Sequence, residues 1–154
     1  MIARDDVIAI LNDLIETSKD GEEGFRSSAK NADDARLKDF FLRRSKEVST
    51  SVRELQDQVR ALGGEPVDST SIGGILHRRW IDIKTALTSN DNLAVLTETE
   101  RGEDAALAAY RKALEQELPA DVRAVILRQV EAVKRNHNLV KHMRNIYEAE
   151  AAVH

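Results

Sequence analysis

The sequence contains no cysteine, and this absence excludes several kinds of chemistry. Disulfide bonds, thiolate nucleophiles, zinc knuckles and iron–sulfur clusters all need cysteine side chains. A chain without cysteine is also compatible with a reducing compartment, so we expect a cytoplasmic location.

Long apolar runs and an excess of basic residues are missing too. No stretch approaches the roughly 18 consecutive apolar residues of a membrane helix, and the first six residues, MIARDD, turn acidic where a signal peptide would become apolar. The 27 acidic and 23 basic residues leave a net charge of -4. Nucleic acids and anionic membranes both call for a concentrated basic face. We therefore expect neither as a partner.

Proline and glycine are scarce, with two and seven residues, and nearly all fall where a helix would start, stop or be interrupted. The alternation typical of strands is absent, and apolar residues instead recur at spacings of three and four. A chain of 154 residues is expected to form one domain. The pattern predicts an all-α domain over residues 1–154 with helices at about 4–30, 34–62, 71–87, 91–117 and 120–148.

The lengths of the connections predict the topology. Short turns at 31–34 and 118–121 force the helices on either side to lie antiparallel, as two hairpins. The connection at 65–91 is too long for a simple loop, and its predicted helix at 71–87 is expected to lie along the outside of the bundle. Hairpin, long crossover and hairpin are the order of a ferritin-like four-helix bundle, in contrast to an up-down bundle with three short loops.

Three segments resemble a known family: LNDLIETSKDGEEGFR at 11–26, LHRRW at 76–80 and ERGEDAA at 100–106. They are similar to the bacterial PA2169-type four-helix-bundle proteins, a domain of unknown function in the ferritin-like superfamily. The resemblance covers essentially the whole chain. It implies a ferritin-like fold in a cytoplasmic bacterial protein and an association with stress, but no established activity, so function has to be argued from the site.

One carboxylate lies where the apolar stripe of its helix calls for a hydrophobic residue. Steps of three and four from Leu96 reach Glu100, Glu103, Leu107 and Tyr110, so Glu103 is expected to point into the core. A buried carboxylate needs a cation, a metal ion or several hydrogen-bond donors. The group that Glu103 meets there is therefore central to any functional interpretation.

The first interpretation is a metal site. Ferritin-like oxidases bind two metal ions with a single Glu from each of two helices and a Glu-x-x-His pair from each of the other two. Neither pair is intact here, because Thr50 stands where the second helix needs His and Lys134 stands where the last helix needs Glu. What remains is a reduced or single site for iron, manganese or zinc, with four candidate ligands: Glu22, Glu47, Glu103 and His137.

The second interpretation needs no metal. Arg44 falls in the apolar stripe between Phe41 and Val48, and its guanidinium has five donors that can satisfy two carboxylates. Arg44, Glu22, Glu103 and His137 would then form an internal polar layer that fixes the register of the helices. Three further polar residues on the last two predicted helices are expected to belong to this layer: Glu100, Tyr110 and Gln129. A third outcome is that the charged side chains reach solvent instead.

The structural layer is the leading interpretation. It favours a non-catalytic or accessory bundle protein that works through self-association or an unknown protein partner. The alternative is a metal-binding or redox protein with a degenerate ferritin-like centre. No nucleophile elbow or phosphate-binding loop is present in the sequence, so no other catalytic class is favoured.

Overall fold

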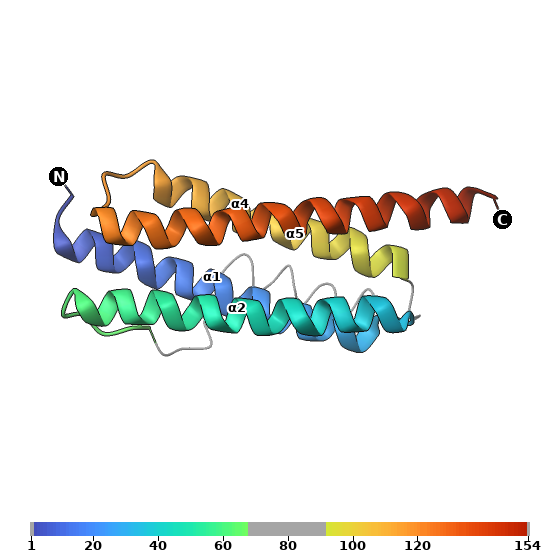
Figure 1. The fold of residues 1–154 in the computed structure, drawn as a ribbon, viewed down its shortest axis with the longest axis horizontal. Coiled ribbons are helices and arrows are strands. Elements are labelled where there is room, and N and C mark those ends of the chain that lie inside the picture. Colours follow the sequence, from blue (N-terminus) through green and yellow to red (C-terminus); the bar gives the residue numbers. More distant parts are fainter. Residues whose placement is uncertain (1, 68–91, 154) are drawn as a thin grey trace.

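The structure is a computed structural model that describes residues 2–67 and 92–153. The described residues form four helices: α1 (Arg4–Asn31), α2 (Ala35–Ala61), α4 (Asn92–Leu114) and α5 (Ala120–Val153) (Figure 1). The prediction of an all-α, ferritin-like four-helix bundle is confirmed. The additional helix predicted at 71–87 lies outside the described residues.

Two helix ends differ from the expected ones. Helix α4 ends at Leu114, before the expected end at about 117, and the chain tightens there through bonds from Glu115 to the carbonyls of Arg111 and Lys112. Helix α5 continues to Val153, past the expected end at about 148. No glycine or proline follows Pro119, so nothing in the backbone stops this last helix earlier.

The turn between α1 and α2 is tied to the other hairpin. The carboxylate of Asp34 accepts a hydrogen bond from the backbone N–H of Arg36 at 2.7 Å, which caps the start of α2. The same carboxylate accepts a bond from the hydroxyl of Tyr147 on α5, also at 2.7 Å. The side-chain oxygen of Asn92 at the start of α4 accepts a bond from the N–H of Asp33. Three helices therefore meet at this end of the bundle.

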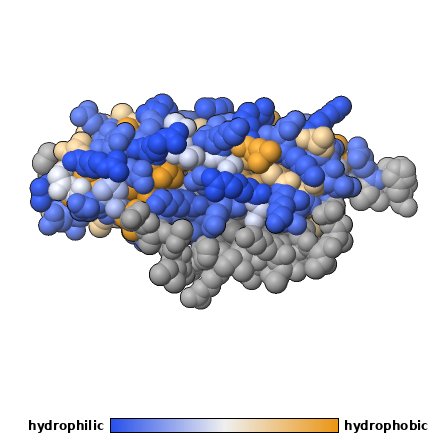
Figure 2. All heavy atoms as spheres, turned by 90° about the horizontal axis from the view of Figure 1, so that it is seen from below, coloured by the Kyte–Doolittle hydropathy of each residue, from blue (hydrophilic) through white to orange (hydrophobic). Residues whose placement is uncertain are grey.

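The helices pack as two hairpins, α1 with α2 and α4 with α5, and α1 also packs along α4. Among the helix pairs in contact, α2 and α5 touch least, and the end of α5 extends past the other helices (Figure 1). The face shown in Figure 2 is mostly hydrophilic over the described residues, with a few hydrophobic patches. None of the described helices combines the length and the apolar character that a membrane span requires.

The core contains two apolar clusters, one toward each end of the bundle. The aliphatic cluster combines the first half of α1 and the second half of α2 with the end of α4 and the start of α5. Its large, fully buried side chains include Leu11, Leu14, Ile15, Leu55, Val59 and Ile126. The phenylalanine cluster lies toward the turn between α1 and α2, and its central members are Phe25, Phe40, Phe41, Val95 and Leu96. Buried polar side chains lie between the two clusters, and they form the candidate site.

Candidate functional site: a buried polar layer around Glu103

Glu103 is buried in the bundle without a hydrogen-bond partner. Its side chain comes from α4, the residue is only 3% exposed, and neither carboxylate oxygen bonds to any described residue. Burial raises the pKa of this carboxyl to about 8 from an ordinary value of 4.5. The charge of Arg44 opposes this rise in pKa, while the nearby Asp104 and Glu100 add to it. The carboxyl group is therefore mostly neutral at pH 7.

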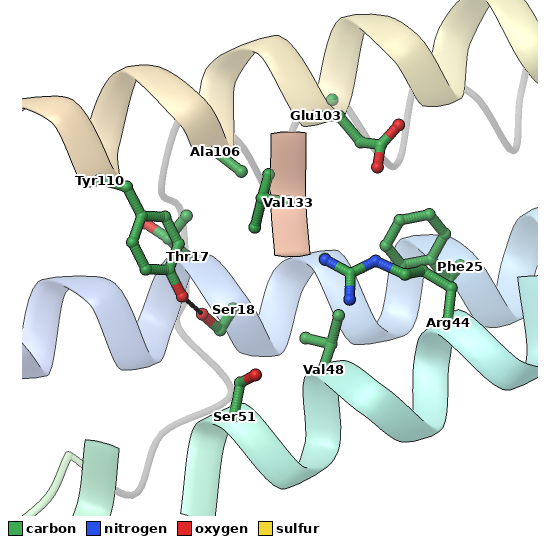
Figure 3. A pocket seen from close by; sticks show the side chains of 12 residues that line it. Thr17, Ser18, Phe25, Arg44, Val48, Ser51, Glu103, Ala106, Tyr110 and Val133 are labelled. Atoms are coloured by element: carbon green, nitrogen blue, oxygen red, sulfur yellow. Dashed lines mark hydrogen bonds between the residues drawn. The ribbon is translucent and has the colours of Figure 1, made fainter. Parts of the chain in front are cut away.

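Arg44 brings a buried positive charge into the same region. It is 4% exposed because it falls on the core face of α2, and its guanidinium enters the interior below Glu103 (Figure 3). Its central carbon lies 5.6 Å from the centre of the Phe25 ring, a distance at which cation and ring attract each other. Its Nη1 lies 3.4 Å from Oε2 of Glu47, and its Nε has no hydrogen-bond partner among the described residues.

The expected direct pairing of Arg44 with Glu103 and Glu22 is not what the structure shows. Arg44 pairs instead with Glu47, whose side chain is 45% exposed at the edge of α2. Glu22 pairs with Arg26 one turn further along α1. The reason is the rotation of α1, which turns Gly21 rather than Glu22 toward the interior between Ser18 and Phe25.

A second group of polar side chains in the layer is fully hydrogen-bonded and involves all four helices. The hydroxyl of Tyr110 on α4 donates to Oε1 of Gln129 on α5 at 2.8 Å and lies 3.3 Å from the hydroxyl of Ser18 on α1. Nε2 of Gln129 donates to the backbone carbonyl of Ser51 on α2 at 3.1 Å and lies 3.4 Å from Glu54. Burial raises the pKa of Tyr110, so its hydroxyl stays protonated.

Tyr110 and Gln129 were expected in the polar layer, but Ser51 and Glu54 were not. The sequence indicates only that the amide of Gln129, once buried, needs hydrogen-bond partners. That requirement could not say which carbonyl or carboxylate of α2 would supply them.

His137 and Glu100 lie on the side of the layer where α4 meets α5. Nε2 of His137 lies 2.6 Å from Oδ1 of Asp104, and Oε2 of Glu100 lies 2.5 Å from Nε of Arg144. Both therefore pair across α4 and α5 rather than with Arg44. The partners Asp104 and Arg144 were not among the predicted site residues.

A small cavity separates Glu103 and Arg44 from the Tyr110 group. It has a volume of about 30 Å³, measured as the space open to the centre of a water molecule. Side chains from all four helices surround it, including Ser18, Arg44, Glu103 and Tyr110 (Figure 3). A methyl group added at Gly21 would meet no atom of the described residues within 4 Å, so no described side chain closes this side of the cavity.

The four predicted metal ligands do not form a ligand set in this arrangement. No group of three or more His, Asp or Glu side chains placed to hold a metal ion occurs in the part of the chain that the structure describes. Glu22, Glu47 and His137 are each paired with another charged side chain, and the polar layer places the buried carboxyl group of Glu103 beside the guanidinium of Arg44. This donor set does not fit a two-metal centre, which takes carboxylates from all four helices and two histidines.

Two antiparallel hairpins with a long connection between them, enclosing a buried polar layer, define the chain as a ferritin-like protein. The chain belongs to the family described as "Domain of unknown function (DUF2383)", whose model matches residues 6–116. The membership in a ferritin-like family of unknown function that the sequence resemblance implied is thereby confirmed. No curated protein matches the sequence.

Several solved structures share the fold, among them the following three. A mutant of Dps1 from Mycobacterium smegmatis aligns with a TM-score of 0.77 and 12% identity over 92% of this chain and 96% of that one. The DPS protein of Vibrio cholerae O1 is described as a member of a broad superfamily of ferritin-like diiron-carboxylate proteins. It aligns with a TM-score of 0.73 and 15% identity over 91% of this chain and 89% of that one. A dodecameric thioferritin, the bacterioferritin-related protein of Bacteroides fragilis, aligns with a TM-score of 0.75 and 15% identity over 98% of this chain and 90% of that one. At these identities the likeness shows the fold alone.

Proposed function

We propose that this protein is a non-catalytic or accessory ferritin-like bundle whose polar layer is structural and which acts through self-association or a protein partner. One observation carries the proposal: Arg44, a fixed cation, lies buried beside Glu103 in the bundle interior. A guanidinium repels metal cations. The neighbouring Tyr110–Gln129 group bonds the four helices to one another, so the layer is suited to holding them in register. The cytoplasmic location and the association with stress stay predictions.

Self-association is supported by exposed apolar residues on the outer side of α5. Leu139 is 50% exposed and Ile146 is 45% exposed, and because they are seven residues apart they lie on one face of the helix. Burying such residues against a second copy removes apolar surface from water. One protein with the same fold is described as dodecameric, so bundles of this shape can assemble.

The test is the molar mass in solution, measured by light scattering during size-exclusion chromatography. We expect the wild-type chain to exceed its monomer mass of 17.2 kDa and the double variant Leu139→Asp/Ile146→Asp to lose that excess. Leu127→Asp is the matched control, because Leu127 is also exposed but lies on a different face of α5. A wild-type protein that is monomeric at all concentrations tested would refute self-association and leave a different protein as the partner.

The second candidate is a degenerate site for iron, manganese or zinc. It is favoured by the two oxygens of Glu103, which have no partner among the described residues, and by the diiron-carboxylate superfamily of one similar structure. For a full site, Glu22, Glu47 and His137 would have to leave Arg26, Arg44 and Asp104. A bound metal would stabilise the folded chain by mass action, about 2.7 kcal/mol at a hundredfold excess over Kd.

The two candidates are separated by metal analysis of protein purified without chelator or affinity tag, combined with thermal unfolding in each metal. The metal candidate predicts near-stoichiometric metal and a higher Tm in wild type, both lost in Glu103→Gln. A melting temperature that is indifferent to all three metals in both proteins would leave the structural layer as the account of Glu103.

A further inference from the structure

The cavity beside Glu103 has the size of a hydration site. A water molecule occupies at least about 10 to 15 Å³. The space open to the centre of a water molecule here is about 30 Å³, so the cavity is large enough to hold water. On the α1 side, a methyl group at Gly21 would touch no atom of residues 2–67 or 92–153 within 4 Å, so the described side chains leave room there.

The walls of the cavity carry groups that lack partners. Both oxygens of Glu103 and Nε of Arg44 are buried without a hydrogen bond to any described residue. The hydroxyl-bearing residues Ser18 and Ser51 also line the space. Water enters a cavity of this size when two to four polar groups can bond to it, whereas an apolar cavity of the same size stays dry. Here both donors and acceptors are available.

We propose that this cavity binds one or two water molecules, which bridge the carboxyl group of Glu103 and the guanidinium group of Arg44. The bridge supplies the contact that the two side chains do not make directly. It leaves the Tyr110–Gln129 bond undisturbed, because those two groups already satisfy each other at 2.8 Å. Hydration of the cavity is independent of self-association, so failure of either test leaves the other standing.

The first test is a high-resolution crystal structure of the wild-type chain. We expect density for one or two waters in the cavity, at least one within about 3.2 Å of both Glu103 and Arg44. An empty cavity, or Glu103 and Arg44 in direct contact, would overturn the proposal. So would a bound anion, which soaking with bromide would reveal by its anomalous scattering.

The second test counts long-lived internal waters in solution by oxygen-17 magnetic relaxation dispersion. We expect the count to fall by at least one in Gly21→Ala, which adds a methyl group on the α1 side of the cavity, and in Glu103→Leu, which removes the acceptors of Glu103. If Glu103→Leu does not fold, Gly21→Ala alone still decides. The matched control is Ile15→Val, which opens space in the aliphatic cluster where an apolar cavity stays dry. An unchanged count in Gly21→Ala would contradict the proposal.

Discussion

The two parts of the polar layer differ in how completely their hydrogen bonds are made. On the side of the aliphatic cluster, Tyr110 and Gln129 each have partners, and the group joins all four helices. On the side of the phenylalanine cluster, Glu103 and Nε of Arg44 have none among the described residues. The first part therefore holds the helices together, while the second retains unsatisfied charge and polarity that another molecule, such as water, can use.

The apolar clusters beside these two parts differ as well. The aliphatic cluster is built mostly from buried valine, leucine and isoleucine side chains. The phenylalanine cluster depends on ring contacts, with Phe41 at 5.6 Å from Phe40 and 6.4 Å from Phe25, measured between ring centres. Phe25 in turn lies against the guanidinium of Arg44. Phe25 thus lies against the charged part of the layer and is itself in contact with Phe41, which makes the ring contacts important for the position of Arg44 as well as for stability.

The largest effect is expected from removing the central ring. Phe41 is fully buried and contacts both other rings, so Phe41→Ala should lower the free energy of unfolding by about 3 to 5 kcal/mol. Urea denaturation followed by circular dichroism measures this loss. Leu42→Ala is the control, because the neighbouring Leu42 is exposed and its loss should have a much smaller effect. Equal losses in the two variants would contradict the central role of the ring.

The pH dependence of stability should come from the unsatisfied part of the layer. The unfolded Glu103 carboxyl titrates near 4.5 and the folded one near 8, so between these values unfolding releases a proton. The free energy of unfolding should therefore fall by on the order of 5 kcal/mol as the pH rises from about 4.5 to about 8. Above that range, the ionisation of Glu103 should change it little.

Urea denaturation at a series of pH values measures this fall. Glu103→Gln keeps the shape of the side chain and cannot ionise, so it should flatten the curve and make the chain more stable than wild type at pH 8. Parallel curves for the two proteins would show that Glu103 is not the group responsible. Glu103→Ala should destabilise the chain at all pH values, because it leaves a larger cavity beside the buried Arg44.

A smaller effect is expected in the satisfied part. Tyr110→Phe removes the hydroxyl that donates to Gln129 and lies near Ser18, leaving a buried amide oxygen without a donor at a cost of about 1 to 3 kcal/mol. The loss should not depend on pH between 5 and 8, in contrast to the behaviour of Glu103. Denaturation of the variant at both pH values measures it, and a strongly pH-dependent loss would mean that the two parts of the layer are coupled.

The smallest effect on stability is expected at the rim of the layer, where the exposed Arg128 of α5 pairs with Glu54 of α2. Nη1 of Arg128 lies 2.7 Å from Oε2 of Glu54, but the arginine side chain is largely exposed. Because solvent screens such pairs, Arg128→Ala should cost less than about 1 kcal/mol in the same denaturation experiment. A loss as large as that of Tyr110→Phe would show that the rim contributes to holding α2 against α5.

The architecture could be predicted because it depends on periodicity and connection length. The three-and-four spacing of apolar residues defined the helices, and the two short turns with one long connection defined the ferritin-like order. The same spacing placed Glu103 and Arg44 on core faces, where the structure buries both. The ends of α4 and α5 were less well defined, since helix ends depend on caps and on local tightening.

The pairing of the charged side chains was decided by the tertiary structure. Periodicity assigns a residue to a face of its helix, but a rotation of one residue exchanges Glu22 for Gly21 at the cavity. Arg44 and His137 have several carboxylates within reach, and only the packed positions of the helices select Glu47 and Asp104. The sequence by itself therefore determined the bundle and the burial of Glu103. Only the tertiary structure decided that Glu103 borders a cavity without a partner, because that depends on distances of a few ångströms between helices.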